Sequence, residues 1–251
     1  MSYTRLKKRH LIRHHIRRHI EKIKASEYAR ILILRTAGNF LLLSSLFMIG
    51  RTFYRPLREE IRYFLDTKTE KKYVVADTMR IAEPEPANRG LLAKAFNIKS
   101  VEVLTPQDPN FSIVIPKIGA NSKVIGNVDV TNEKEYLDVL QKGVAHAAGT
   151  AFPGEGGHVF LFAHSTDYFW NVGTYNAIFY LLYKLEKNDE VDVFYKGQRH
   201  VYKVIGTEVV DPSQVQYLTR KTNREFLTLQ TCWPLGTTLR RLLVFAVRQA
   251  E

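Results

Sequence analysis

The chain has 251 residues, of which 45% are hydrophobic and 25% are charged, and its formal net charge is +12. This length allows one domain of ordinary size with additional segments. The composition excludes a wholly disordered chain, a collagen-like chain and a multi-span membrane protein. The single cysteine excludes an intramolecular disulfide framework and any zinc site that needs two thiolates.

The basic excess lies in an N-terminal tail. Residues 1–30 contain ten lysines and arginines against two glutamates, so most of the net charge belongs to this segment. Isoleucines recur in it at helical spacing, which is typical of a helix that lies on anionic lipid. Basic segments also bind nucleic acid, but the apolar segment that follows favours lipid, and we expect no nucleic-acid partner. A solvated tail without any ligand is the remaining alternative.

Residues 31–50 predict a transmembrane helix, because twenty helical residues span about 30 Å, the thickness of the hydrocarbon core of a bilayer. Arg35 and Asn39 interrupt this run, and Arg35 is close enough to its start for the guanidinium to reach the headgroups. Lysine and arginine are denser before the segment than after it. The positive-inside rule therefore predicts a cytoplasmic N-terminus and an extracellular body. We expect an uncleaved signal-anchor in a single-pass cell-membrane protein.

The rest of the chain divides into a predicted stalk or linker at 51–110 and a body at 111–251. The stalk is rich in charge and proline in its second half. In the body, apolar runs predict strands, and two segments show helical spacing. The predicted strands are 111–119, 122–130, 158–164, 190–196, 199–210, 224–232 and 240–248, and the predicted helices are 132–143 and 174–186. About eight strands with so few helices indicate a mainly β barrel with one or two short helices.

Two polar residues with catalytic potential end apolar strands. Cys232 closes FLTLQTC and His164 closes HVFLFAH. If these strands are neighbours, the thiol and the imidazole face one cleft, and this pair is the minimum for thiol acyl transfer. Arg240 and Arg241, before the last strand, offer forked cationic donors for an oxyanion. Taken singly, an inert core cysteine, a structural histidine and a solvated arginine pair are the commoner interpretations.

Together these segments resemble the sortase family. TLQTC at 228–232 resembles the sortase signature TLxTC, and WPLGTTLRRLLVFAV after it is similar to the family's Pro-x-Gly-Thr…Arg-Leu-Val-Val continuation. Upstream, GVAHAAGTAFPGEGGHVFLFAHS at 143–165 resembles the segment in which the catalytic histidine ends a strand. The resemblance covers 111–251, with departures at Ala163 and Trp233. It implies an eight-stranded sortase-type β-barrel.

By position, the resemblance implies that Cys232 is the nucleophile, His164 the general acid and Arg241 the residue that stabilises the oxyanion. Adjacent strand residues point to opposite faces, so Arg240 and Arg241 cannot both enter the cleft. We expect Thr231 and Trp233, which flank the cysteine, to contact substrate.

No cofactor or metal is expected. Some sortases use calcium, and this chain has four carboxylates in plausible loops, Asp167, Asp189, Glu190 and Asp192. They do not form a set spaced as calcium ligands, so no metal site is assigned.

The resemblance implies a cysteine transpeptidase that cleaves an LPxTG-like sorting signal of secreted proteins through a thioester. The acyl group then passes to an amine, either a cell-wall peptide or a pilin lysine. Two alternatives remain open at this stage. One is a membrane-tethered thiol hydrolase or endopeptidase that releases its acyl-enzyme to water. The other is a non-catalytic, membrane-anchored binding module.

Overall fold

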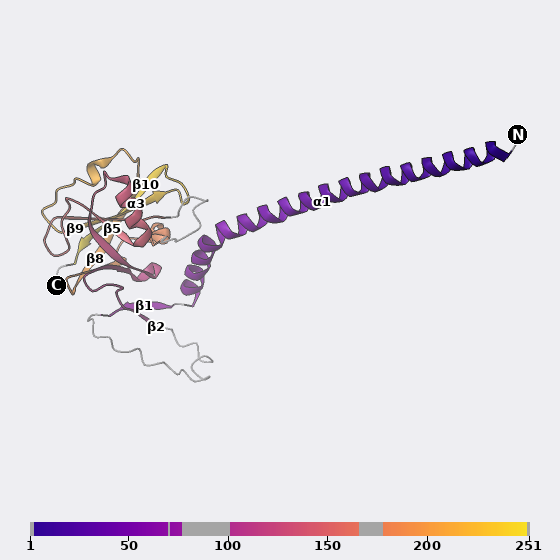
Figure 1. The fold of residues 1–251 in the computed structure, drawn as a ribbon. Coiled ribbons are helices and arrows are strands. Elements are labelled where there is room, and N and C mark those ends of the chain that lie inside the picture. Colours follow the sequence, from indigo (N-terminus) through magenta and orange to yellow (C-terminus); the bar gives the residue numbers. More distant parts are fainter. Residues whose placement is uncertain (1–2, 70, 77–100, 166–177, 250–251) are drawn as a thin grey trace, which may run out of the picture. The chain divides into compact units, whose positions relative to one another are not determined.

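The computed structural model describes residues 3–69, 71–76, 101–165 and 178–249. The chain divides into two compact units, Met1–Tyr54 and Arg55–Glu251. Helix α1 (Tyr3–Lys68) makes up the described part of the first unit and continues into the second (Figure 1).

The part of α1 from Glu27 to Tyr54 is a candidate membrane span of 28 residues, with a mean hydropathy of 1.7 and no residue buried. Hydroxyl groups in this stretch donate to carbonyls one turn earlier, as from Thr36 to Leu32 and from Ser45 to Leu42, both at 2.8 Å. These bonds satisfy polar groups that would otherwise be costly in hydrocarbon. The prediction of an apolar N-terminal helix is confirmed. Because α1 runs through residues 30 and 50 without a break, the predicted domain boundaries there stay predictions.

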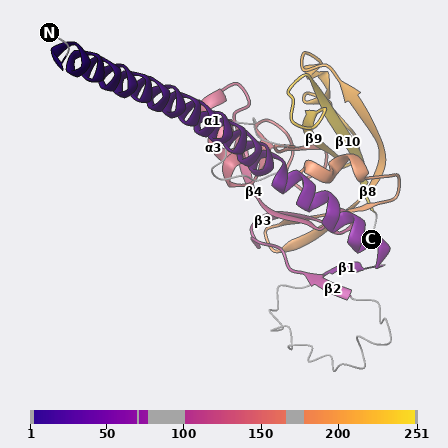
Figure 2. The same cartoon turned by 90° about the vertical axis from the view of Figure 1, so that its right-hand side faces the viewer.

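The second unit is built on a closed barrel of eight strands in the order β10-β8-β7-β3-β4-β5-β6-β9. Figure 2 shows β8, β9 and β10 gathered in one wall. The strands are β3 (Phe111–Ile115), β4 (Ala120–Val128), β5 (Val144–Ala147), β6 (His158–Phe162), β7 (Glu190–Tyr195), β8 (Gln198–Val210), β9 (Phe226–Trp233) and β10 (Arg240–Arg248). The predicted eight-stranded, mainly β barrel is confirmed.

Two pairs in the barrel are parallel, β4 with β5 and β6 with β9. The first is joined by helix α3 (Glu133–Lys142), as a parallel connection requires a crossover. Asn132 caps α3, because its side chain accepts a hydrogen bond from the backbone N–H of Glu135. The apolar side of α3 packs through Leu140 on the outer face of β6, against Phe160 and Phe162.

The structure differs from the predicted elements at several places. Strand β5 was not predicted, since it is four residues long and half alanine. The predicted helix 174–186 appears, in its described part, as a 3-10 helix η2 (Tyr180–Lys184). The first strand ends at Ile115, because Pro116 has no N–H to donate and begins 3-10 helix η1 (Pro116–Ile118). Within the predicted stalk, β1 (Lys72–Val75) pairs in parallel with β2 (Val101–Leu104).

Candidate active site

Two adjacent strands, β9 and β10, and the segment that follows the neighbouring strand β6 carry the predicted catalytic residues. On one side of β9, Cys232 pairs directly with Arg241 of antiparallel β10. On the other side, Gln230 pairs with Phe162, the last residue of β6. Directly opposed residues in an antiparallel pair have their side chains on the same face, about 5 Å apart at Cβ. The register therefore places the Arg241 side chain beside the thiol.

The pairing of β6 with β9 continues one residue beyond the end of β6. The backbone N–H of Ala163 donates to the carbonyl of Gln230 at 3.1 Å, and the Thr231 hydroxyl donates to the carbonyl of Ala163 at 2.9 Å. The next residue along the chain is His164. If the pairing of Phe162 with Gln230 is continued by two residues, His164 lies level with Cys232. Two hydrogen bonds thus fix the chain directly before the histidine.

All three side chains lie on the outer face of the barrel wall. Strand residues alternate between faces, and the residues that alternate with the three, such as Leu161, Leu229 and Leu242, belong to the barrel interior. Cys232, His164 and Arg241 consequently face the side on which α3 packs. A site on the outside of a filled barrel is accessible to a peptide chain, whereas the interior is not.

A cleft of about 540 Å³ on this outer face brings Cys232, His164 and Arg241 together. Helix α3 forms one wall with Tyr136, Leu137 and Leu140, and the connection between β8 and β9 forms the other. The other wall is lined by Asp211, Pro212, Gln214, Val215, Tyr217 and Leu218, and the connection after β9 adds Gly236, Thr237 and Thr238. The walls of the cleft therefore combine apolar side chains, such as Leu140 and Leu218, with polar ones, such as Asp211 and Gln214.

The charge state of the thiol is set by two opposing effects. Burial raises the pKa of the Cys232 thiol above its usual value, and the nearby Arg241 guanidinium lowers it. The Arg241 guanidinium is oriented by its backbone contacts, because Nη1 donates to the carbonyls of Thr238 at 3.1 Å and Arg240 at 3.2 Å. A partly exposed thiol beside a fixed cation is a suitable environment for a nucleophile.

The neighbours of these three residues are placed differently. Arg241 is among the described residues that line the cleft, and Arg240 is not, as strand alternation predicts. Thr231 also lines the cleft, but its hydroxyl is bonded to Ala163 and is buried. Trp233 packs at the edge of the interior core, where its ring centroid lies 5.6 Å from that of Tyr183. Substrate contact by Thr231 and Trp233 stays a prediction.

The other histidines of the barrel have structural contacts. His146 is buried and its Nδ1 accepts from the backbone N–H of Asn127 at 3.2 Å. His158 is buried, and its Nε2 hydrogen-bonds with the hydroxyl of Thr228 at 2.8 Å. Burial and the nearby Arg220 lower the pKa of His158 to about 4. His158 is therefore neutral at physiological pH.

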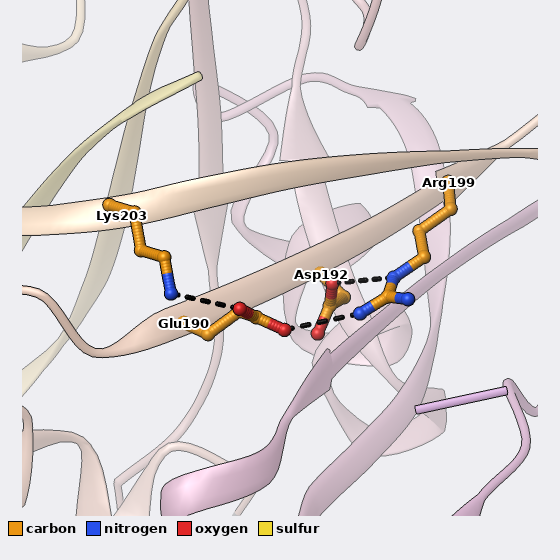
Figure 3. Close-up of polar contacts among 4 residues, drawn as sticks. All are labelled: Glu190, Asp192, Arg199 and Lys203. Carbon is orange, nitrogen blue, oxygen red and sulfur yellow. Dashed lines mark hydrogen bonds and ion pairs between the residues drawn. The ribbon is translucent and has the colours of Figure 1, made fainter. Parts of the chain in front are cut away.

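The carboxylates considered for calcium are paired with cations instead. Asp189 pairs with Lys117 at 2.9 Å, and Figure 3 shows Glu190 and Asp192 pointing toward Arg199 and Lys203. No group of three or more histidine, cysteine or acidic residues in the described ranges is placed to hold a metal. Asp167 lies outside the described residues.

Sequence reasoning did not identify the two walls of the cleft. Gln214 and Val215, on the second wall, have no motif around them. The helical stripe of Tyr136, Leu137 and Leu140 was predicted, but not the cleft that it lines. Arg220 was also missed: its guanidinium lies 5.0–5.4 Å from the ring centroids of Tyr217, Phe226 and Phe245. Such a cluster has no signature in a single sequence.

Comparison with known proteins finds sortases both by sequence and among solved structures. The sequence model of the family described as "Sortase domain" matches residues 113–249, more than half of the chain. Sortase D of Bacillus subtilis (strain 168) is 24% identical over 189 residues, which are 73% of this chain and 87% of that protein. Among solved structures, sortase C-1 from Actinomyces oris is 32% identical with a TM-score of 0.47, covering 58% of this chain and 76% of that one. A Clostridium perfringens Sortase D5 transpeptidase is 24% identical with a TM-score of 0.46, covering 57% and 80%. By the extent of the family-model match, the chain belongs to the sortase family, whose members are cysteine transpeptidases that recognise sorting signals.

Proposed function

We propose that this chain is a membrane-anchored cysteine transpeptidase that cleaves an LPxTG-like sorting signal of secreted proteins. The observation that carries this proposal is the cleft lined together by Cys232 of β9, Arg241 of β10 and His164, which follows the end of β6. The sulfur attacks the carbonyl carbon of the scissile peptide bond. Arg241 donates hydrogen bonds to the oxyanion of the tetrahedral intermediate, and imidazolium His164 protonates the leaving amine as the C–N bond breaks.

The second half of the reaction resolves a thioester on Cys232. An amine of a cell-wall peptide or of a pilin lysine attacks the thioester carbonyl, and neutral His164 accepts the proton that the amine loses. The C–S bond then breaks with its electron pair on sulfur and the acyl group stays on the amine as an amide, which restores the thiolate of Cys232 and imidazolium His164. The apolar side chains of the cleft, among them Leu137, Leu140 and Val215, support aminolysis over hydrolysis, because they keep water from part of the surface around the thioester.

The proposed location of the enzyme follows from the unequal density of lysine and arginine on the two sides of the candidate span in α1. We infer that the basic tail lies in the cytoplasm on anionic lipid, that the segment 31–50 anchors the chain, and that the catalytic domain 111–251 works outside the cell. The 28-residue candidate span and the density of lysine and arginine before it support this orientation.

The test combines the full chain in detergent with a library of LPxTG-like peptides and a soluble amine, with products identified by mass. Wild-type enzyme is expected to form a peptide–amine product and a thioester adduct on Cys232. Cys232→Ala should form neither, and His164→Ala should lower the rate about 10²–10⁴-fold. A product that ends in a free carboxylate, formed by attack of water on the thioester, would identify a thiol hydrolase instead. An intact peptide with a folded wild-type enzyme would contradict the proposal.

A further inference from the structure

The last turns of α1 have their apolar face turned away from the protein. Within the second unit, four large apolar side chains at positions 57, 61, 64 and 65 form one stripe, since residues three and four apart share a helix face. Their exposed fractions are 59% for Leu57, 49% for Ile61, 58% for Phe64 and 53% for Leu65. A helix on the surface of a soluble domain normally has the opposite arrangement.

The side of the same turns that faces the barrel holds the helix to it through Tyr63, which packs against the interior core, and through the polar residues Glu60 and Arg62. Glu60 accepts a hydrogen bond from the hydroxyl of Tyr183 and pairs with Lys184 at 3.5 Å. Arg62 Nη2 donates to the carbonyl of Ile118 at 3.0 Å. Turning the apolar stripe inward would break these contacts, so the outward orientation is a property of the packed domain.

The position of the stripe in the chain indicates what covers it. Leu57 follows the end of the candidate span at Tyr54 by three residues, which is about 4.5 Å along a helix. The 28 residues of the candidate span cover about 42 Å as a helix, which is the thickness of the hydrocarbon together with both headgroup layers. The stripe therefore begins at the outer edge of the headgroup region. Pro56 lies between the candidate span and the stripe. Proline has no N–H to complete the helical hydrogen bonding, so the helix can change direction there.

The exposed charged residues of these turns are basic, whereas the acidic ones, Glu59, Glu60 and Asp66, are half-buried. Arg58 and Lys68 are exposed beside it, and the Lys68 ammonium lies 5.6 Å from the ring centroid of Phe64. Basic side chains that flank an apolar stripe are typical of interfacial helices, whose cations contact lipid phosphates. In water, these four apolar side chains would stay exposed as one apolar patch.

We propose that residues 57–68 form an interfacial helix, whose stripe of Leu57, Ile61, Phe64 and Leu65 inserts into the lipid surface and docks the catalytic domain on it. This inference rests on the proposed membrane anchor. The helix is then more than a spacer, because its apolar face binds lipid while its other side holds the barrel through Tyr63, Glu60 and Arg62.

The test measures the depth of single sites in the full chain reconstituted into phosphatidylcholine–phosphatidylglycerol vesicles. Spin labels are attached at Ile61→Cys, Phe64→Cys and Thr67→Cys in a Cys232→Ala background, so no catalytic activity is needed. Collision with oxygen, which concentrates in lipid, is compared with collision with a water-soluble nickel chelate. The ratio of the two is expected to be severalfold higher at 61 and 64 than at Thr67, an exposed polar position off the stripe.

Two controls separate the possible causes of failure. A label at Leu42→Cys, in the candidate span, reports whether the anchor is in the bilayer. A label at Ile205→Cys, an exposed apolar position on β8, reports apolar exposure without lipid. If Leu42 is in lipid while 61 and 64 match Thr67 and Ile205, the interfacial helix is wrong and the anchor stands. If Leu42 is in water, the anchor fails too. Labels at 61 and 64 that neither reagent reaches, or that broaden one another between copies, would show that protein covers the stripe and would overturn the inference.

Discussion

The substitution Asp192→Asn tests whether burial or ion pairing controls the pKa of a carboxyl group on β7. The Asp192 side chain is fully buried, and its Oδ1 accepts from Arg199 Nε at 2.8 Å. Its Oδ2 has no hydrogen-bond partner among the described residues. Arg199 is shared with Glu190, which also pairs with Lys203 (Figure 3). Burial raises the pKa of Asp192 to about 6, from an ordinary value of 3.8, and Arg199 opposes the rise.

The sign and size of the effect follow from this pKa. Between pH 3.8 and about 6 the folded chain keeps a proton on Asp192 that the unfolded chain has released. Stability contributed by this group is therefore present below pH 3.8 and falls as the pH rises toward 6. At about 1.4 kcal/mol per pH unit, the fall is about 3 kcal/mol in total. Asp192→Asn has no titrating group there, so the difference in free energy of unfolding between wild type and variant should fall by that amount.

The assay is urea unfolding of a fragment that begins at Arg55. Circular dichroism monitors the unfolding at a series of pH values from about pH 4 to about pH 8. Groups other than Asp192 titrate in both proteins, so most of their contribution cancels in the difference. A difference that rises with pH would refute the reasoning, because it would mean that pairing with Arg199 holds the folded-state pKa below 3.8.

Three further outcomes are expected at the cleft. Arg241→Ala should lower kcat/KM about 10²–10³-fold, whereas Arg240→Ala, on the other strand face, should change it less than about threefold; equal losses would contradict the register. Modification of Cys232 by a methanethiosulfonate should speed up as pH rises above the usual thiol range, and Arg241→Ala should move that profile to higher pH, because the arginine lowers the thiol pKa. Arg220→Gln should raise KM for the peptide about tenfold, with a smaller change in kcat, since three ring contacts hold the β8–β9 wall. The exposed Lys221→Gln is its control, and a loss confined to kcat would argue against a positioning role.

Much of the barrel was predictable because its signals are local. The apolar runs of β6 and β9 are strands buried in a sheet, and each was read from consecutive residues. A cap before the periodic apolar stripe of α3 was expected at Thr131 or Asn132, and the structure has it at Asn132. Cys232 and His164 were singled out because each closes such a run. These features depend on spacing within about ten residues, which a single sequence displays directly.

Elements that depend on distant partners were not predictable. Strand β5 contains two alanines and a histidine, and it exists because β4 and β6 offer hydrogen bonds on its two sides. The 3-10 geometry of Tyr180–Lys184, in place of an α-helix, is another such case. A helical spacing of apolar residues predicts only that one face of the helix is covered. Packing against the surrounding residues then determines whether the segment is an α-helix or a 3-10 helix.

The sequence by itself determined the elements and the identity of the reactive groups, since strand pattern, helix cap and motif are properties of neighbouring residues. Only the tertiary structure decided that Cys232 and Arg241 are cross-strand partners, because register is a relation between two strands. It also decided which way the last turns of α1 face. An apolar stripe such as Leu57 and Ile61 would ordinarily predict a buried surface, but the contacts of Glu60 and Arg62 with the barrel turn it outward.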